Sequence, residues 1–392
     1  MSQSLINRNP DLLRLQNEGY EVSILSGHVL VSSVPYLNSQ GQICHGTLVS
    51  TLALSGEQTI TPDTHVIYFI GEIPHNYNGT VIQGIQHGQN INQTLAENLT
   101  VNHSFSNKPS GGYRDYYEKF YRYIEIISAQ ARHKEPTLTA KTFKVIESHE
   151  DSVFHYTDTN SSRAGIRYVN ERLRNQRIAI VGIGGTGSYI LDLVAKTPVG
   201  EIHLFDGDDL LQHNAFRAPG APSLEELQSK QKKAEYFASI YGKMHRHIMV
   251  HPDYVGQNNV YELEAMNFVF LCVDKGTSRK LVVEKLVECE IPFVDVGIGI
   301  LPPVDNSVFG HVRMTLGAAD NGYASKRFLT LADDPNDEYF SNIQIADLNA
   351  LNAALAVIKW KKYYGFYQDF RKEHSLTYTI NTGALTREDQ SL

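Results

Sequence analysis

The chain has 392 residues, of which 42% are hydrophobic and 20% charged, so it is long enough for two or three globular domains and too apolar to be mainly disordered. Its 35 Lys and Arg residues against 43 Asp and Glu residues give a net charge of −8, which argues against nucleic acid or an anionic membrane as the main partner. The cysteines, Cys44, Cys272 and Cys289, are too few and scattered for a disulfide framework, and they favour a reducing, cytoplasmic compartment. No export signal follows Met1 and no stretch approaches ~18 apolar residues, so we expect neither export nor membrane insertion.

The first part of the chain is predicted to be a separate α+β domain, residues 1–150. Residues 20–32 are predicted to form two strands around a turn, and residues 65–70 a further strand. The Asn- and Gly-rich residues 76–107 are expected to be mostly surface loop. Residues 115–131 have helical spacing, and we interpret the aromatic stripe on one face of that helix as core packing.

A polar segment, residues 149–162, is expected to link this domain to a second one, residues 161–392. Strand and helix patterns alternate there, which predicts an α/β fold with a doubly wound, Rossmann-like, mostly parallel sheet. Strands are expected at residues 177–182, 201–205, 267–273 and 292–296. Helices are expected at residues 188–195, 224–241 and 277–289.

A glycine-rich turn follows the first strand of the second domain and opens a helix. Such a turn lets the backbone approach a phosphate closely, while the N–H groups at the helix N-terminus face the anion. Asp206 ends the next strand, where a carboxylate can accept hydrogen bonds from ribose hydroxyls. This pattern by itself leaves NAD, FAD and ATP open as ligands. The turn residues predicted to contact the phosphates are Gly182, Gly184, Gly185, Thr186 and Gly187.

The polar residues that follow favour ATP over a redox cofactor. Asn214 and Arg217 come soon after the second strand. Lys232 and Lys233 lie on the helix expected next. A dehydrogenase has no chemical need for these groups, whereas attack of a carboxylate on an α-phosphate builds negative charge that preorganised Arg, Lys and Asn donors stabilise. Asp274 follows the third strand, at the edge where open α/β sheets hold ligands, and could carry Mg²⁺.

In these features the second domain resembles the ThiF/MoeB/HesA superfamily of ubiquitin-activating-type adenylyltransferases. The resemblance covers residues 161–355, roughly half of the chain, and Gly185 supplies the extra glycine that the family's turn usually contains. The other matching residues are, in chain order, Ser162 and Arg163, the acidic pair Asp206 and Asp208, the Asn-x-x-Arg residues Asn214 and Arg217, Lys233 (with Lys232 as the runner-up), and the pair Asp274 and Arg279.

The resemblance implies a role for each matched residue. The glycines would cradle the phosphates of ATP, Asp206 would hold the ribose, and Asp274 would bind magnesium. Arg163 would reach into the ATP site of a second subunit, so the enzyme would be a homodimer. The residues that would position and neutralise the phosphates are Asn214, Arg217 and Lys233.

Other interpretations of these residues stay open. Asn214 is also suited to cap a helix, and Asp208 to a turn. The paired lysines could lie on a solvated helix face. Arg279 could serve only to pair with Glu284 or another nearby acid.

The sequence also departs from the family pattern. Many relatives hold structural zinc with two C-x-x-C pairs, which this chain lacks, so no zinc is expected. Relatives that form a thioester place a cysteine on a late loop, but residues 317–342 contain none, and Cys272 lies in an apolar run that predicts burial. The adenylate is therefore expected to pass directly to a partner enzyme or to be captured as an oxyester, with Ser325 the first candidate and Thr330 and Ser341 as alternatives. An ordinary loop serine is the alternative for Ser325.

The N-terminal domain resembles an uncharacterised domain fused to bacterial ThiF-like proteins, for example in the run Val34-Pro35-Tyr36. Such fusions occur near ubiquitin-like proteins and isopeptidases, so this domain could dock a partner or modifier. The expected activity is therefore ATP-dependent adenylation of the C-terminal carboxylate of a ubiquitin-like protein in a bacterial conjugation pathway, with a conjugating enzyme as a further partner. An NAD-dependent Rossmann oxidoreductase and a non-catalytic docking module for ubiquitin-like proteins remain the alternatives.

Overall fold

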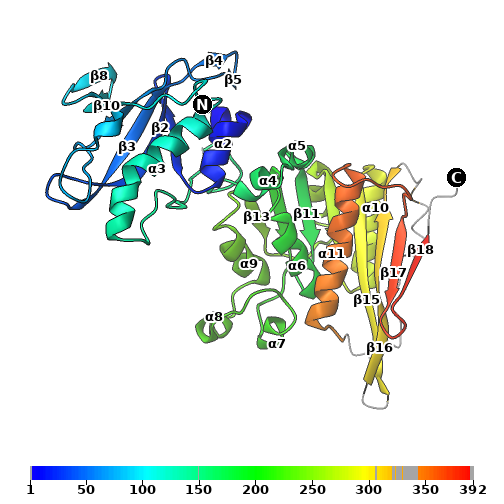
Figure 1. Ribbon diagram of the computed structural model, residues 1–392. Coiled ribbons are helices and arrows are strands. Elements are labelled where there is room, and N and C mark those ends of the chain that lie inside the picture. Colours follow the sequence, from blue (N-terminus) through cyan, green and yellow to red (C-terminus); the bar gives the residue numbers. More distant parts are fainter. Residues whose placement is uncertain are drawn as a thin grey trace. The chain divides into compact units, whose positions relative to one another are not determined.

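The chain folds into two compact units, Met1–Ile146 and Glu147–Leu392 (Figure 1). No helix in the described part of the chain is long and apolar enough to cross a membrane. The computed structural model describes residues 2–148, 150–304, 307–319, 323, 329 and 343–388.

The first unit combines an antiparallel sheet with a long helix. Among the described residues the main sheet has the strand order β1-β2-β3-β6-β10-β7. Its elements are α1 (Ser2–Arg8), α2 (Pro10–Asn17), β1 (Glu21–Leu25), β2 (His28–Leu37), β3 (Ile43–Thr51), β4 (Leu54–Ser55), β5 (Gln58–Thr59), β6 (Val66–Ile70), η1 (Gln83–Ile85), β7 (Gln86–Gly88), β8 (Gln93–Ala96), β9 (Leu99–Val101), β10 (His103–Ser106) and α3 (Tyr116–Lys134).

The predicted strands and helix of this unit are present. The hairpin of β1 and β2 turns at Ser26 and Gly27, whose φ values of 46° and 75° are those of the tight turn that matches strand twist. Helix α3 begins after Asp115, whose carboxylate accepts a hydrogen bond from the backbone N–H of Glu118 at 2.8 Å. The predicted aromatic stripe packs in the core, where its four members are fully buried: Tyr116, Phe120, Tyr123 and Ile127.

The prediction that residues 76–107 are mostly loop is wrong in part. The segment contains η1 and β7 to β10, and β10 lies inside the sheet between β6 and β7. Its polar residues are buried because they have partners: Ser104 Oγ lies 2.9 Å from Nδ1 of His87, and His103 Nδ1 accepts from the N–H of Asn90. Hydrophobic alternation does not reveal a strand whose buried face is polar and hydrogen-bonded.

The second unit is an α/β domain. Among the described residues its sheet has the order β13-β12-β11-β14-β15-β16-β17-β18. In this order, neighbouring strands are parallel from β13 as far as β15 and antiparallel from β15 as far as β18. Its elements are α4 (Thr159–Arg163), α5 (Arg167–Asn170), η2 (Glu171–Leu173), β11 (Arg177–Val181), α6 (Gly185–Val194), β12 (Glu201–Phe205), α7 (Gln212–Ala215), α8 (Leu224–Ser229), α9 (Lys233–Tyr241), β13 (Ile248–His251), η3 (Val260–Ala265), β14 (Phe268–Leu271), α10 (Gly276–Glu288), β15 (Phe293–Val304), β16 (Ser307–Gly317), α11 (Ala346–Tyr363), β17 (Ser375–Thr379) and β18 (Ala384–Glu388).

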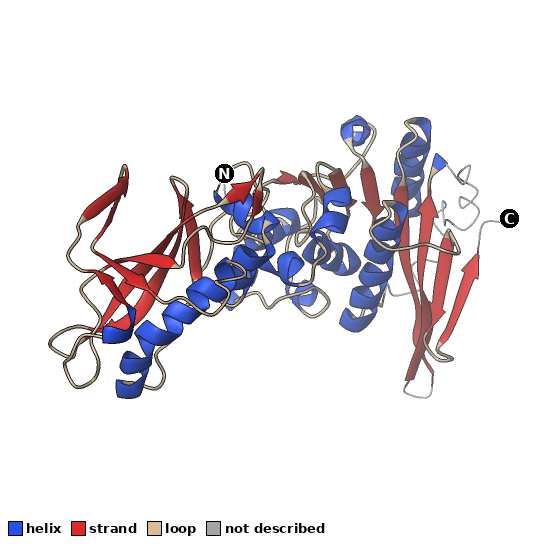
Figure 2. Cartoon of the chain, turned by 45° about the horizontal axis from the view of Figure 1, so that its top comes forward, coloured by secondary structure: helices blue, strands red, loops and turns tan. Residues whose placement is uncertain are grey.

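Helices cover both faces of this sheet, which confirms the predicted doubly wound fold. Residues of α6, α9 and α11 pack in the core on one face, including Leu191, Phe237 and Trp360. Val282 of α10 and Leu263 of η3 belong to the core on the other face. Figures 1 and 2 show α11 running along the sheet beside β15 and β16. The edge strand β13 and the long antiparallel half were not predicted.

The single helix predicted at residues 224–241 is wrong, because the structure has α8 and α9 with a break between them. Lys230 has a left-handed φ of 50°, and the next residues run extended. There the backbone of Lys232 forms an antiparallel β-bridge with that of Asp209, and the N–H of Lys233 donates to the carbonyl of Asp208 at 3.0 Å. This break places Lys233 at the start of α9, beside the end of β12.

Candidate functional site

The strand order creates a crevice at the carboxyl ends of β11 and β14. From β11 the chain proceeds outward through β12 to β13, then crosses to β14 and β15 on the other side of β11. In open α/β sheets ligands bind at such a switch point. A cavity of about 1160 Å³ lies there, large enough for a nucleotide and part of a second substrate.

The predicted glycine turn lines this cavity, and its glycines serve different steric purposes. Gly182 has a φ of 91°, which a tight turn requires and which side chains disfavour. A Cβ on Gly187 would lie 1.9 Å from the carbonyl oxygen of Gly182, so α6 packs against the turn only with glycine there. A Cβ on Gly184 would meet no atom within 4 Å, and this residue lines the cavity. The turn therefore leaves its backbone open to an anion at Gly184.

The extra glycine, Gly185, leaves room for a side chain from another part of the unit. A Cβ at this position would lie 2.1 Å from Nδ2 of Asn349, a fully buried residue on α11. Asn349 Oδ1 accepts a hydrogen bond from the hydroxyl of Thr186 at 2.9 Å, and its Nδ2 donates to the carbonyl of Arg217 at 3.1 Å. One amide thus connects the phosphate turn to the loop that carries Arg217. Sequence analysis missed Asn349, since no local motif marks it.

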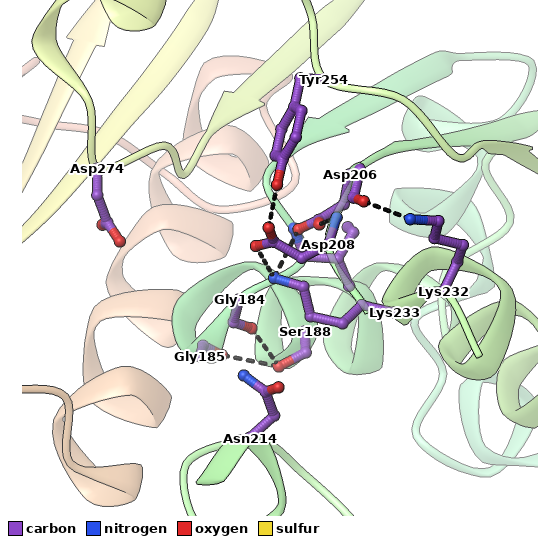
Figure 3. Close-up of polar contacts among 12 residues, drawn as sticks. Gly184, Gly185, Ser188, Asp206, Asp208, Asn214, Lys232, Lys233, Tyr254 and Asp274 are labelled. Atoms are coloured by element: carbon purple, nitrogen blue, oxygen red, sulfur yellow. Dashed lines mark hydrogen bonds and ion pairs between the residues drawn. The ribbon is translucent and has the colours of Figure 1, made fainter. Parts of the chain in front are cut away.

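An acidic pair and a buried lysine form the next part of the site (Figure 3). Nζ of Lys233 lies 3.1 Å from Asp206 and 2.7 Å from Asp208, and its side chain is only 5% exposed. The interpretation of this lysine as part of a solvated helix face is therefore wrong. Asp206 is buried and also accepts from the N–H groups of Ile183 and Asp208, at 2.7 and 2.8 Å, so it ties the glycine turn to the end of β12.

Asp208 is the more accessible carboxylate of the pair, with its side chain half exposed. Tyr254 donates its hydroxyl proton to Asp208. Burial raises the pKa of Asp208, but the hydrogen bonds from Lys233 and Tyr254 outweigh it and bring the pKa below its ordinary value. The same hydrogen bond raises the pKa of Tyr254 to about 12. Asp208 is therefore an anion near neutral pH, and its exposed oxygens can accept hydroxyl hydrogens.

Asn214 and Arg217 follow β12, as predicted; Arg217 lines the cavity, whereas Asn214 lies beside the glycine turn and is not among the lining residues (Figure 3). Asn214 is buried, and its Oδ1 accepts from the N–H of Leu211 at 2.8 Å, which caps the short helix α7. Arg217 lines the cavity, and its buried Nε has no hydrogen-bond partner among the described residues. Arg217 thus places a cation at the wall of the cavity.

The remaining predicted residues lie on three other parts of the unit. Asp274 lines the cavity after β14, and its Oδ2 lies 3.3 Å from Nε2 of Gln344. Arg279 pairs with the buried Asp295, at 2.9 Å, and not with Glu284. Arg163 is exposed at the end of α4. Ser325, the candidate hydroxyl nucleophile, lies outside the described residues, as do its alternatives Thr330 and Ser341.

Cys272 is partly buried, packs against the hydrophobic core and lines the cavity. The residue comes directly after β14, where the chain leaves the sheet for the switch point. Burial of its thiol, together with the nearby Asp295 and Asp274, raises its pKa well above the ordinary value. This thiol is therefore a poor nucleophile at neutral pH.

Comparison with known families accounts for this arrangement. Residues 124–346 match the model of the ThiF family, and residues 10–159 match a domain of unknown function designated DUF6791. The chain belongs to the ThiF family. The predicted membership of the ThiF/MoeB/HesA superfamily of adenylyltransferases is thereby confirmed.

Relatives of this ThiF-family chain include ubiquitin-like modifier-activating enzyme 5 of Culex quinquefasciatus, 24% identical over 162 residues, which cover 38% of this chain and 40% of that protein. The corresponding protein of Rattus norvegicus is 21% identical over 188 residues, 45% of each chain. The chain thus spans less than half the length of these relatives. Among solved structures, selenomethionine PaaA covers 69% of this chain and 83% of its own, at 14% identity and a TM-score of 0.48. E. coli MccB with ATP covers 60% and 72%, at 17% identity and a TM-score of 0.45.

Proposed function

We propose that this protein activates a carboxylate by ATP-dependent adenylation and releases pyrophosphate. The observation that carries the proposal is the convergence, in one switch-point cavity, of an open glycine turn and two cations, the buried Lys233 and Arg217. A carboxylate oxygen would attack the α-phosphorus as the bond to the bridging oxygen of the β-phosphate breaks. The negative charge that builds on the phosphate oxygens would be stabilised by cations already in place.

The acidic pair holds Lys233 in position. Asp208 is suited to accept hydrogen bonds from the ribose hydroxyls, either together with Asp206 or in its place. Asp206 already accepts two backbone N–H groups and the ammonium of Lys233, so few of its lone pairs remain for a ligand. Asp274 fits the predicted magnesium site, since Mg²⁺ commonly takes one or two carboxylates and completes its shell with substrate phosphates and water. The ion would neutralise phosphate charge.

The carboxylate we propose is the C-terminus of a ubiquitin-like protein in a bacterial conjugation pathway within the cytoplasm. The relatives named as ubiquitin-like modifier-activating enzymes support this substrate class. The pathway is proposed only from the sequence resemblance of the N-terminal domain to domains fused to bacterial ThiF-like proteins. The three cysteines are free thiols, which suits a reducing compartment. A conjugating enzyme would receive the activated acyl group.

The proposal is tested by calorimetric titration with Mg-ATP and with NADH, followed by ATP–pyrophosphate exchange with a ubiquitin-like protein that ends in a free carboxylate. We expect ATP binding, no NADH binding, and exchange that disappears when that carboxylate is amidated. Binding of NADH in place of ATP would identify an oxidoreductase. Binding of the ubiquitin-like protein without any exchange would identify a docking module.

We also propose that two copies of the chain form each active site, with Arg163 of one copy acting at the cavity of the other. Neither Arg163→Ala nor Arg217→Ala should support exchange alone. A mixture of the two variants should recover about a quarter of wild-type exchange, because half of the dimers would be mixed and each would hold one intact site. Absence of recovery, with subunit mixing shown by mass spectrometry, would mean that Arg163 does not act in trans.

A further inference from the structure

We propose that His203 and His251 share one proton on the face of β12 and β13 next to the cavity, and that this proton makes the acidic wall of the cavity sensitive to pH. The inference goes beyond the proposed adenylation, because it concerns the protonation of two side chains that do not line the cavity. No local motif marks the pair, since its members lie 48 positions apart in the chain.

Four titratable side chains form one continuous series of contacts. Nε2 of His203 lies 3.2 Å from Oε2 of Glu201, and Nδ1 of His203 lies 3.0 Å from Nε2 of His251. Nδ1 of His251 lies 2.8 Å from Oε2 of Glu262. Glu201 and His203 belong to β12, His251 ends the edge strand β13, and Glu262 lies on η3, which packs on the same face of the sheet. The series therefore connects the edge strand to its neighbour and to η3.

These contacts require one proton more than two neutral imidazole rings carry. An ionised carboxylate only accepts hydrogen bonds, so the nitrogen of each ring that faces a glutamate must carry a hydrogen. A neutral imidazole has a single N–H, so the other two nitrogens would face each other with lone pairs at 3.0 Å. One added proton turns this contact into an N–H···N hydrogen bond. A second would bring two N–H groups and two positive charges together, so the pair is satisfied by one.

The surroundings of the pair place the positive charge on His203. Burial lowers the pKa of His251, the charge of Glu262 raises it, and the neighbouring His203 lowers it again, so that the pKa of His251 lies below its ordinary value. The charged groups that contact the pair are Glu201 and Glu262, and Glu201 also pairs with Arg177 of β11 at 3.2 Å. A single cation thus lies between two carboxylates.

His251 connects the pair to the acidic wall of the cavity. Its backbone carbonyl accepts a hydrogen bond from the N–H of Asp206 at 3.2 Å, and its ring stacks on Phe205 with centroids 4.0 Å apart. Three residues later, Tyr254 donates its hydroxyl proton to Asp208. The connected residues that line the cavity are Phe205, Asp206, Asp208 and Tyr254. A change in the orientation of the His251 ring therefore reaches the residues that hold the two carboxylates in place.

The proton count gives the pair its greatest stabilising effect between two pH limits. The first proton adds a hydrogen bond, so the folded chain holds it more tightly than the unfolded chain does, and this stabilisation is lost as the pH rises and the proton leaves. The folded pair resists a second proton, so stability is also lost as the pH falls. Because the two protons bind in separate steps, the limits belong to the pair and not to either ring. They are expected on either side of about pH 6.5.

Glu262→Gln tests the proton count directly. The glutamine amide can donate to Nδ1 of His251, which lets that ring carry its hydrogen on Nε2 and donate to His203 without any added proton. The melting temperature of the wild type should fall between about pH 7 and pH 9. The fall should be much smaller in Glu262→Gln, which should be the more stable protein at about pH 9. His247→Gln is the matched control, because Nδ1 of His247 contacts the backbone carbonyl of Gly200 and no second imidazole, so its profile should follow the wild type.

Histidine-selective NMR of the full chain measures the protons themselves. The signals that disappear in His203→Gln and in His251→Gln identify the pair, and in the wild type they should titrate in two steps more than about one pH unit apart. The affinity for ATP, measured by calorimetry, should fall about fivefold between about pH 7 and pH 9 in the wild type and change little in Glu262→Gln.

Several results would overturn the inference. Glu262→Gln could lower the melting temperature equally at every pH, or the two rings could titrate in one common step. Stoichiometric binding of Zn²⁺ that both histidine variants abolish would mean that a metal ion, and not a proton, joins the rings. A constant ATP affinity over this pH range would contradict the connection to the cavity. Failure of ATP to bind at any pH would contradict the proposed function, and the melting and NMR measurements would still decide whether the rings share a proton.

Discussion

Replacing Lys233 by methionine should lower ATP–pyrophosphate exchange by about two orders of magnitude or more, and Arg217→Ala should have an effect of similar size. Both cations are expected to act on charge that grows in the transition state, so the affinity for ATP should fall much less than the rate. Loss of Lys233 has a second consequence. The buried Asp206 and the neighbouring Asp208 would lose the cation that they share. Ionisation of both carboxylates at the same time would then be disfavoured.

Lys232→Met is the informative comparison for this prediction. Lys232 precedes Lys233 directly, but it is 38% exposed and binds Asp209 and the carbonyl of Gly207 at 2.9 and 2.8 Å. Its loss should reduce exchange far less than the loss of Lys233. Comparable losses in the two variants, or wild-type exchange in Lys233→Met, would show that the buried position of Lys233 has no catalytic meaning.

Gly185→Ala should abolish measurable ATP binding and lower the melting temperature, because the new methyl group would occupy the space of the Asn349 amide. The three atoms nearest to it are all in that side chain, at 2.1 to 2.6 Å, so either the phosphate turn or α11 must move. Overpacking of this kind typically costs about 1–3 kcal/mol. Asn349→Ala in the wild-type background should weaken ATP binding more mildly, since it removes the hydrogen bonds to Thr186 and the Arg217 loop.

The double variant, Gly185→Ala with Asn349→Ala, provides the decisive measurement for this contact. The second substitution removes the atoms that the new methyl group would meet, so stability and ATP affinity should recover well beyond the sum of the two single effects. Residues in contact commonly show coupling of about 0.5–3 kcal/mol. Additive losses in melting temperature and in calorimetric ATP affinity would mean that Gly185 is required for another reason.

Local sequence determined the framework on which the site is built. The run of strand, glycine turn and helix at Gly182–Gly187 is encoded by neighbours in the chain, since the turn needs a positive φ at Gly182 and close helix packing at Gly187. Hydrophobic periodicity likewise predicted the alternation of strands and helices, and with it a ligand site at the carboxyl ends of parallel strands. These features depend on residues within about one supersecondary unit, so a local pattern is sufficient to reveal them.

Tertiary structure alone decided which polar residues meet. Arg279 could pair with several acids as judged from spacing, and only the placement of α10 against β15 selects Asp295. Asn349 reaches Thr186 across 163 positions of sequence, and no periodicity records such a contact. The break before Lys233 is set by pairing with the segment after β12 and not by a helix-breaking residue. In each case the partner that satisfies a buried polar group is chosen by long-range packing, which a linear pattern does not contain.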